Sequence, residues 1–161
     1  MNNSGTQENT TIGVIADTHG KLSSSAKQAL KGVDIIIHAG DIHTLSILIQ
    51  LKEIAPIRAV LGNVDGGITF RHLPATDVVE VGEVSIYVLH NLENLNIDPK
   101  AAGFDAIIYG HSHHPENKIR NGVLFLNPGS ASFPRRGSSP SIARLQIQGT
   151  HLRAELIQLE Q

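Results

Sequence analysis

The sequence has no cysteine, a net charge close to zero and no apolar run long enough to span a membrane. Without cysteine, disulfides and thiolate metal sites are excluded, and the chain suits a reducing compartment. Thirteen Lys and Arg residues against 15 Asp and Glu residues give a formal charge of −2 at pH 7. No overall field therefore recruits nucleic acid or a membrane surface, and any affinity for phosphate must be local.

The first ten residues, MNNSGTQENT, lack both the apolar core and the basic start of a signal peptide. A chain of 161 residues can bury one sizeable core. We therefore expect residues 1–10 to be disordered, residues 11–161 to form a single domain, and the location to be cytoplasmic with no membrane segment. The sequence does not disclose the oligomeric state, and a homo-oligomer stays open.

Short apolar runs rich in β-branched residues predict strands that are buried on both faces. Helical patterns at Ser24–Lys31 and Leu45–Ile54 separate the first three runs, and a short helix is expected after Asp98. The order β-α-β-α-β implies parallel strands and an α/β fold. The principal runs are Thr11–Ala16, Asp34–His38, Ile57–Leu61, Val84–Leu89 and Ala106–Tyr109.

The second half of the chain has a different character, because its apolar runs come in hairpin-like pairs. No internal repeat or domain linker is evident, and the stretch 133–140, FPRRGSSP, is the clearest candidate for a mobile loop. The pairs are Asp77–Val81 with Val84–Leu89, Asn117–Arg120 with Val123–Leu126, and Ser141–Gln148 with His151–Leu159.

Residues able to bind a metal follow each of the five principal strands. In an open α/β sheet, ligands bind beyond the carboxyl ends of the strands, so side chains far apart in sequence can converge there. This arrangement predicts a metal site. The candidates are Asp17 and His19 after the first run, Asp41 after the second, Asn63 after the third, His90 after the fourth, and His111 with His113 after the fifth.

The spacing of these candidates supports convergence. In extended backbone alternate side chains share one side, so we expect Asp17 to face with His19 and His111 to face with His113. A glycine precedes Asp41, Asn63 and His111, which suits tight turns and close backbone approach. Neither a D-x-H nor an H-x-H pair is specific by itself.

The combination of motifs is far more specific, and it resembles the calcineurin-like metallophosphoesterases. The matching segments are DTH at 17–19, GD at 40–41, GNVD at 62–65 and GHSH at 110–113. The short chain and the NPGS segment at 127–130 look like the small bacterial and archaeal phosphodiesterases of that superfamily.

The resemblance implies a four-layer α-β-β-α sandwich with two mixed sheets and two metal ions at one end. Carried over by position, Asp17, His19 and His113 would hold the first metal, and Asn63, His90 and His111 the second. Asp41 would bridge both metals. The catalytic group would be Asp41, Asn63 and His90, with Asn63 able to contact both metal and phosphate.

Imidazole, carboxylate and amide ligands together suit transition metals better than magnesium. Manganese is the first choice by resemblance, with zinc, iron, nickel and cobalt as alternatives. The charges of two divalent cations and two carboxylates sum to a net charge of about +2. This charge would attract a phosphoester and would lower the pKa of a water that bridges the metals. The predicted function is therefore hydrolysis of a small phosphodiester or nucleotide-like substrate by a metal-bridging hydroxide.

The chain departs from the family pattern at two places. Larger members have a histidine, thought to protonate the leaving group, where this chain has Val64. At the fourth strand the family has H-G or H-G-H, whereas Asn91 and Leu92 follow His90 here. The general acid is therefore unassigned, and the second metal site is the one whose flanking residues depart from the family pattern.

Other polar residues have a structural and a functional interpretation. His43 could donate a proton or lie in a solvated loop, and Asp65 could orient a ligand imidazole. Arg135 and Arg136 could hold a phosphate or be solvated. His38 is expected to be a hydrogen-bonded core residue, and His114 a bystander.

Two other functions remain open. A phosphomonoesterase would use the same site. A non-catalytic, protein-binding scaffold, as in the retromer subunit of this superfamily, predicts a degraded metal constellation, whereas here all seven candidate positions are intact.

Overall fold

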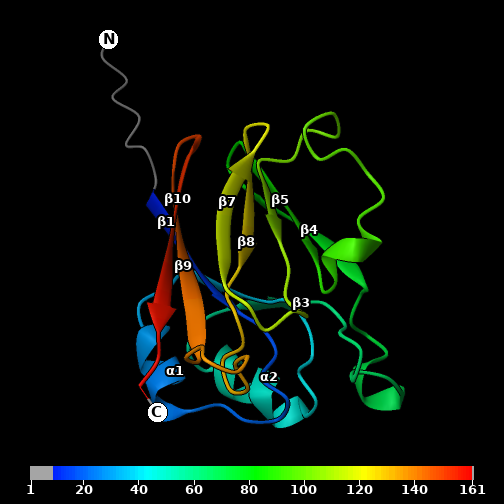
Figure 1. Ribbon diagram of the computed structural model, residues 1–161, viewed down its shortest axis with the longest axis vertical. Helices are drawn as coiled ribbons and strands as arrows, with labels where there is room; N and C mark the ends of the chain where they lie inside the picture. The colour runs from blue at the N-terminus through cyan, green and yellow to red at the C-terminus, as the bar shows by residue number, and fades with distance from the viewer. Residues whose placement is uncertain (1–8, 161) are drawn as a thin grey trace.

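The computed structural model describes residues 9–160, which form two five-stranded sheets. Figure 1 shows both sheets, with the helices gathered at one end. The first sheet has the order β10-β9-β1-β2-β3 and the second the order β4-β5-β6-β8-β7. The strands of the first sheet are β1 (Asn9–Ile15), β2 (Ile35–His38), β3 (Ile57–Ala59), β9 (Ser141–Gln148) and β10 (His151–Gln158); those of the second are β4 (Thr76–Val81), β5 (Val84–Leu89), β6 (Ala106–Ile108), β7 (Glu116–Arg120) and β8 (Val123–Asn127).

Both sheets are mixed, as expected. In the first sheet β1, β2 and β3 are parallel, while β9 runs antiparallel to both β1 and β10. In the second sheet β5, β6 and β8 are parallel, and β4 and β7 are antiparallel edge strands. The three predicted hairpins are confirmed as the pairs β4–β5, β7–β8 and β9–β10.

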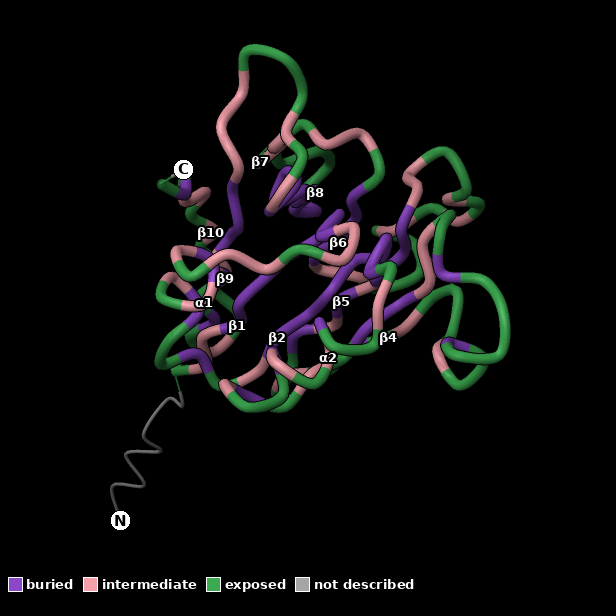
Figure 2. The backbone as a smooth tube through the Cα atoms, turned by 90° about the horizontal axis from the view of Figure 1, so that it is seen from below, coloured by how far each residue is buried: buried purple, intermediate pink, exposed green. Residues whose placement is uncertain are grey.

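The principal core lies between the two sheets. Ile12 and Ile37 from the first sheet pack in one cluster with Ile86, Ile108 and Leu126 from the second, and all five side chains are fully buried. Figure 2 shows that the buried trace follows the inner strands. Burial of this apolar surface, at roughly 25 cal/mol per Å², stabilises the packing of the two sheets.

The outer layers differ between the two sheets. Helices α1 (Ser24–Ala29) and α2 (Leu45–Lys52) pack on the first sheet through a second cluster that includes Leu30 and Leu51. The outer face of the second sheet is covered by the segment 91–104, which contributes Leu92, Leu95 and Phe104. Within this segment of the described chain the one helical element is the 3-10 helix η2 (Leu92–Asn94), and a second 3-10 helix, η1 (Ile68–Phe70), follows β3.

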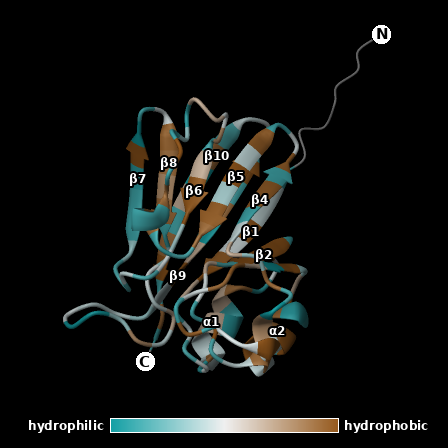
Figure 3. Ribbon diagram, turned by 90° about the vertical axis from the view of Figure 1, so that its right-hand side faces the viewer, coloured by the Kyte–Doolittle hydropathy of each residue, from teal (hydrophilic) through white to brown (hydrophobic). Residues whose placement is uncertain are grey.

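The hydropathy pattern follows these layers. Figure 3 shows apolar residues along β5, β6 and β8 and a largely hydrophilic edge strand β7. β8 is buried at all five positions, whereas β7 is mostly exposed. Charged side chains on an edge strand discourage pairing with other chains.

The expectation of a short helix after Asp98 needs correction. The short helix expected after Asp98 is a single turn, in which Ala102 N donates to Asp98 O at 2.9 Å and Phe104 N to Pro99 O. Gly103, at φ 87°, ends that turn. Ser23 caps α1 by accepting from Ala26 N, but Thr44 makes no side-chain cap on α2.

The N-terminal expectation lies mostly outside the described residues. Of the segment 1–10, the structure describes Asn9 and Thr10, which belong to β1 and pair with β9. Within residues 9–160, no helix is long and apolar enough to cross a membrane.

Candidate metal centre

The segments that follow β1 and β2 run side by side beyond the ends of the strands. Backbone hydrogen bonds join Asp17 N to Gly40 O at 3.0 Å and His19 N to Asp41 O at 2.9 Å. Parallel pairing therefore continues past the last strand residues and sets Asp17 and His19 beside Asp41.

The second sheet reaches the same place through the segment that follows β6. His111 N donates to Asp17 Oδ2 at 3.1 Å, and Gly110 N donates to His90 O at 2.9 Å. Ser130, after β8, donates through Oγ to Asp17 O at 2.7 Å. Asp17 is thus held by groups from both sheets.

Two glycines allow this close approach. A Cβ at Gly62 would collide with the backbone and carboxylate of Asp41, and one at Gly110 would lie 2.9 Å from both Ala16 Cβ and Asp17 Oδ2. The prediction that these glycines serve close backbone approach is confirmed.

The explanation from alternating extended residues is wrong. Asp17, His19, Asp41, His111 and His113 all have positive φ, between 45° and 72°. Non-glycine residues in this region cost about 1–3 kcal/mol each and concentrate at functional sites. Left-handed residues at alternate positions, rather than extended backbone, shape both segments, and they place Asp17, His19 and His113 in one group while His111 lies beside His90.

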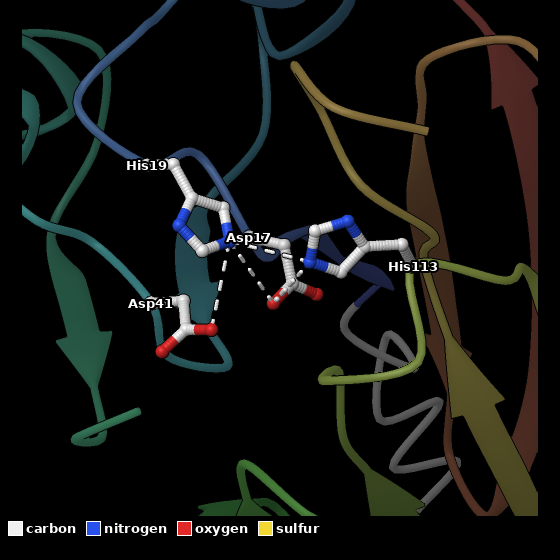
Figure 4. A group of neighbouring side chains, drawn as sticks. All are labelled: Asp17, His19, Asp41 and His113. Atoms are coloured by element: carbon white, nitrogen blue, oxygen red, sulfur yellow. Dashed lines mark hydrogen bonds and ion pairs between the residues drawn. The ribbon is translucent and has the colours of Figure 1, made fainter. Parts of the chain in front are cut away.

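Four side chains form a compact group, shown in Figure 4. One ligand atom from each of Asp17, His19, Asp41 and His113 lies within 4.8 Å of the others. His19 Nε2 is 3.5 Å from Asp41 Oδ2 and 3.2 Å from His113 Nε2, and His113 Nε2 is 3.4 Å from Asp17 Oδ1. Two carboxylates and two imidazoles at such distances can hold a transition metal.

His90 joins the group from the end of β5. Its Nε2 lies 3.2 Å from Asp41 Oδ2 and 3.9 Å from Asp17 Oδ1. Its Nδ1 is 2.7 Å from Ala39 O, which can only accept a hydrogen bond. The Nδ1 atom therefore carries a proton, and Nε2 is the ring nitrogen that faces the carboxylates.

His113, like His90, is oriented by a backbone carbonyl group that contacts its Nδ1 atom. Its Nδ1 lies 2.5 Å from Phe133 O, which fixes the proton on Nδ1 and presents Nε2 to Asp17. Ser130 Oγ accepts from Phe133 N at 2.8 Å and so positions this carbonyl. Sequence reasoning missed the carbonyls of Ala39 and Phe133, although Phe133 lies three residues after the NPGS segment that supports the family resemblance.

The two carboxyl groups have opposite electrostatic surroundings. Burial raises the pKa of Asp17 to about 6, against the lowering effect of His90 and His113. Burial acts in the same sense on Asp41, but His90, the Val64 N–H and His19 outweigh it and lower the pKa of Asp41 to about 2. Burial alone would lower the pKa of His90, yet Asp41 and the Ala39 carbonyl raise it.

Two buried polar atoms at the centre lack a hydrogen-bond partner within the described residues: Asp17 Oδ1 and His90 Nε2. His90 Nε2 is 3.2 Å from Asp41 Oδ2, but this contact does not have hydrogen-bond geometry. Orphaned buried polar atoms are costly unless something binds them. Divalent cations bound at this centre would satisfy these atoms, so the residues present fit metal ions.

The remaining two candidates lie at the margin. His111 is exposed, and its ring centroid is 5.2 Å from that of His90. Asn63 is exposed and lines a cavity together with His90. The structure thus brings five of the seven side chains into direct proximity and sets these two beside His90.

Asp65 does not orient an imidazole, contrary to the sequence expectation. Its carboxylate accepts from the backbone N–H groups of Ile42, His43 and Gly62, at 2.8–3.1 Å. It therefore ties the segment after β2 to the segment after β3, with Asp41 between them.

The other polar candidates lie as follows. His38 is fully buried, accepts from Gly40 N at 3.1 Å and lies 3.0 Å from Thr18 Oγ1, as expected of a core histidine. His43 is exposed and has φ 77°. Arg135 donates from Nε to Ser112 O at 2.5 Å, and Arg136 is exposed.

The sequence profile of the calcineurin-like phosphoesterase superfamily domain matches residues 11–150. The chain therefore belongs to the calcineurin-like phosphoesterases, and the resemblance indicated by the four motifs is confirmed. It is similar to MJ0623 of Methanocaldococcus jannaschii, a probable metallophosphoesterase, with 34% identity over 163 residues that cover 93% of this chain and 82% of the relative.

Solved structures agree on the fold. An archaeal phosphodiesterase has a TM-score of 0.76 and 25% identity, covering 91% of this chain and 99% of that one. Vps29 from Entamoeba histolytica, in complex with Zn²⁺, has a TM-score of 0.71 and 23% identity over 92% of this chain and 98% of its own. The second likeness concerns the fold alone.

Proposed function

We propose that this protein is a dinuclear metal-dependent phosphodiesterase that hydrolyses a small phosphodiester or nucleotide-like substrate. The observation that carries the proposal is the pair of orphaned buried atoms, Asp17 Oδ1 and His90 Nε2, within a group of carboxylates and imidazoles. The similarity to an archaeal phosphodiesterase supports a diester substrate.

In this proposal Asp17, His19 and His113 would hold one metal, and Asn63, His90 and His111 would hold a second. Asp41 would be shared by both sets, because its Oδ2 is within 3.5 Å of both His19 Nε2 and His90 Nε2. Mixed nitrogen and oxygen ligands suit manganese, our first choice, or zinc, iron, nickel or cobalt.

Two such ions would supply a hydroxide nucleophile and neutralise charge on the phosphoryl oxygens. The chain's own residues fix the ligand set around them: Ala39 O and Phe133 O orient two imidazoles, and Asp65 holds the backbone around Asp41. Asn63, exposed beside His90, is the group that contacts the substrate phosphate.

The chain has no side chain able to protonate the leaving group at the position where larger family members have a histidine. Val64 occupies that position, is 43% exposed, and contributes only its backbone N–H, which donates to Asp41 Oδ1 at 3.1 Å. A phosphodiester with a good leaving group is therefore the favoured substrate.

A non-catalytic protein-binding scaffold is the second candidate. The fold likeness to Vacuolar Protein Sorting 29, a protein named for sorting rather than hydrolysis, favours it. A phosphomonoesterase is the third. The cytoplasmic location and a homo-oligomeric state remain predictions.

The test is a screen of diesters, monoesters and nucleotides against the protein loaded with Mn²⁺. We expect turnover of a diester with a p-nitrophenyl leaving group that stops on addition of chelator. Full metal occupancy with no turnover of any diester or monoester would instead support the scaffold.

A further inference from the structure

A cavity of about 310 Å³ opens beside the proposed second metal and has Asn63 and His90 in its wall. Its volume is at the lower end of the range for small-molecule sites. The wall extends away from the metal centre, between the chain leaving β3, the start of β4 and the end of β5.

The chemistry of the wall is neutral. Apart from His90, the polar side chains that line it are those of Asn63, Thr76, Asn91 and Asn94, and Leu61 and Leu89 supply apolar surface. None of these lining residues is a lysine, an arginine or a carboxylate. A further phosphate placed there would find no cationic side chain among the lining residues to neutralise its charge.

The amides are able to bind a neutral group. Asn91 Oδ1 accepts from Glu93 N at 3.1 Å, which starts η2 and leaves the side-chain NH₂ of Asn91 to donate. Carboxamides and hydroxyls offer both donors and acceptors, as do sugar hydroxyls and the edges of bases. The adjacent leucines suit the apolar faces of such groups.

The position of the cavity relates it to the reaction. Asn63 contacts the substrate phosphate in the proposed function, and the cavity begins at this residue. A group in the cavity would therefore be one of the two ester groups on the phosphorus.

We propose that this cavity binds one alcohol part of the phosphodiester, and that this part is a neutral group rich in hydrogen-bonding atoms, such as a nucleoside or a glyceryl group, rather than a further phosphate. The inference rests on the proposed function for its link to catalysis. Its binding component is independent of turnover.

The kinetic test introduces a charge into the wall with Asn94→Lys, using Asn96→Lys as the matched control. Asn96 is also exposed but does not line the cavity. Substrates are the p-nitrophenyl phosphodiesters of thymidine and of glycerol, with ADP-ribose as the diphosphate. We expect Asn94→Lys to raise KM for whichever neutral ester is preferred by about fivefold to tenfold, the effect of losing one or two hydrogen bonds, and to improve kcat/KM for ADP-ribose.

Asn96→Lys should change neither parameter. Equal kinetics of Asn94→Lys and Asn96→Lys on all three substrates would overturn the inference. The preference between the thymidine and glyceryl esters identifies which source of the neutral group fits better.

The binding test uses the metal-free protein and observes the side-chain NH₂ signals of Asn91 and Asn94 by NMR. We expect titration with thymidine or glycerol to shift these signals, and inorganic pyrophosphate to leave them unchanged. Shifts with pyrophosphate alone, or with none of the three, would contradict the inference. Because this readout requires no hydrolysis, a protein that binds thymidine here but cleaves no diester would contradict the proposed function and not the cavity's specificity.

Discussion

At the scale of single residues, Asp41 is the side chain on which both halves of the proposed metal centre depend. It is 4% exposed, and its carboxylate lies within 3.5 Å of imidazoles from two different segments. Its lowered pKa, about 2, keeps it ionised throughout the physiological range.

Asp41→Asn should therefore abolish metal binding and reduce hydrolysis by at least about 100-fold, since even supporting residues of metal sites cost 10–100-fold. The amide oxygen can still accept from Val64 N, so the fold should survive. Metal content and diester hydrolysis are the measurements, and Asp98→Asn, on an exposed turn, is the control. Retained metal in Asp41→Asn would show that this residue is not the bridge.

His113 and His114 provide a matched pair of neighbouring imidazoles. His113 Nε2 faces Asp17, whereas His114 is exposed. His113→Ala should lose activity and keep its circular dichroism spectrum, while His114→Ala should leave both unchanged. Unchanged hydrolysis by His113→Ala would mean that the segment after β6 is misassigned.

His38 offers a prediction on stability. Burial lowers the pKa of His38 to about 3, below its ordinary value of 6.5. His38 in the unfolded state therefore binds a proton more tightly than in the folded state. Its contribution to the free energy of unfolding is fully present above about pH 6.5. This contribution falls as the pH drops toward 3, by at most about 1.4 kcal/mol per pH unit. His38→Gln lacks this dependence.

Urea unfolding of both metal-free proteins between pH 7 and pH 4 tests this. As the pH falls, the free energy of unfolding of the wild type should decrease relative to that of His38→Gln. A constant difference would indicate that His38 titrates normally in the folded state.

At the scale of elements, the site depends on how the segments after β2 and β3 are joined. Asp65 is 2% exposed and accepts three backbone N–H groups from these segments. Asp65→Asn replaces one oxygen by a donor that faces those N–H groups. We expect a loss of stability of about 1.5–3 kcal/mol and a 10–100-fold loss of metal affinity.

Asp77→Asn is a suitable control, because Asp77 forms an ion pair with Arg58 on the surface, 2.8 Å apart. Such a pair contributes about 0–1 kcal/mol. If neither Asp65→Asn nor Asp77→Asn changed the metal affinity, the role given to Asp65 would be wrong.

The sequence predicts the strands well and the local geometry of the site less well. Apolar runs bounded by glycine and aspartate locate β1, β2 and β5 because burial on both faces permits little else in those positions. Convergence was predictable from the rule that carboxyl ends of parallel strands share one edge.

Backbone conformation after the strands was not predictable from periodicity. The alternation argument assumed extended residues at Asp17 and His19, but both have positive φ. The bonds that Asp65 makes with Ile42 and His43 join residues more than twenty positions apart, and only tertiary structure reveals them. After Asp98, the chain closes one turn and stops at Gly103, whose positive φ ends it before a helix forms.

At the scale of the whole molecule, the two sheets act as one frame. Asp17 comes from the first sheet, His90 and His113 come from the second, and the core between the sheets fixes their separation. Protein purified without chelator should accordingly contain about two transition-metal ions per chain, as measured by elemental analysis.

The same frame should remain folded without metal, because the core between the sheets does not involve the ligands. Metal removal is therefore expected to abolish hydrolysis and to lower the melting temperature while leaving the unfolding transition cooperative. A protein that unfolds on chelation would show that the ions are structural.

The measurement that tests the central claim most directly is anomalous X-ray diffraction from crystals of the Mn²⁺-loaded protein. We predict two anomalous peaks about 3.5–4 Å apart, with the Asp41 carboxylate between them and His90 Nε2 and His113 Nε2 each beside one peak. A single peak, or two peaks that Asp41 does not bridge, would contradict the account.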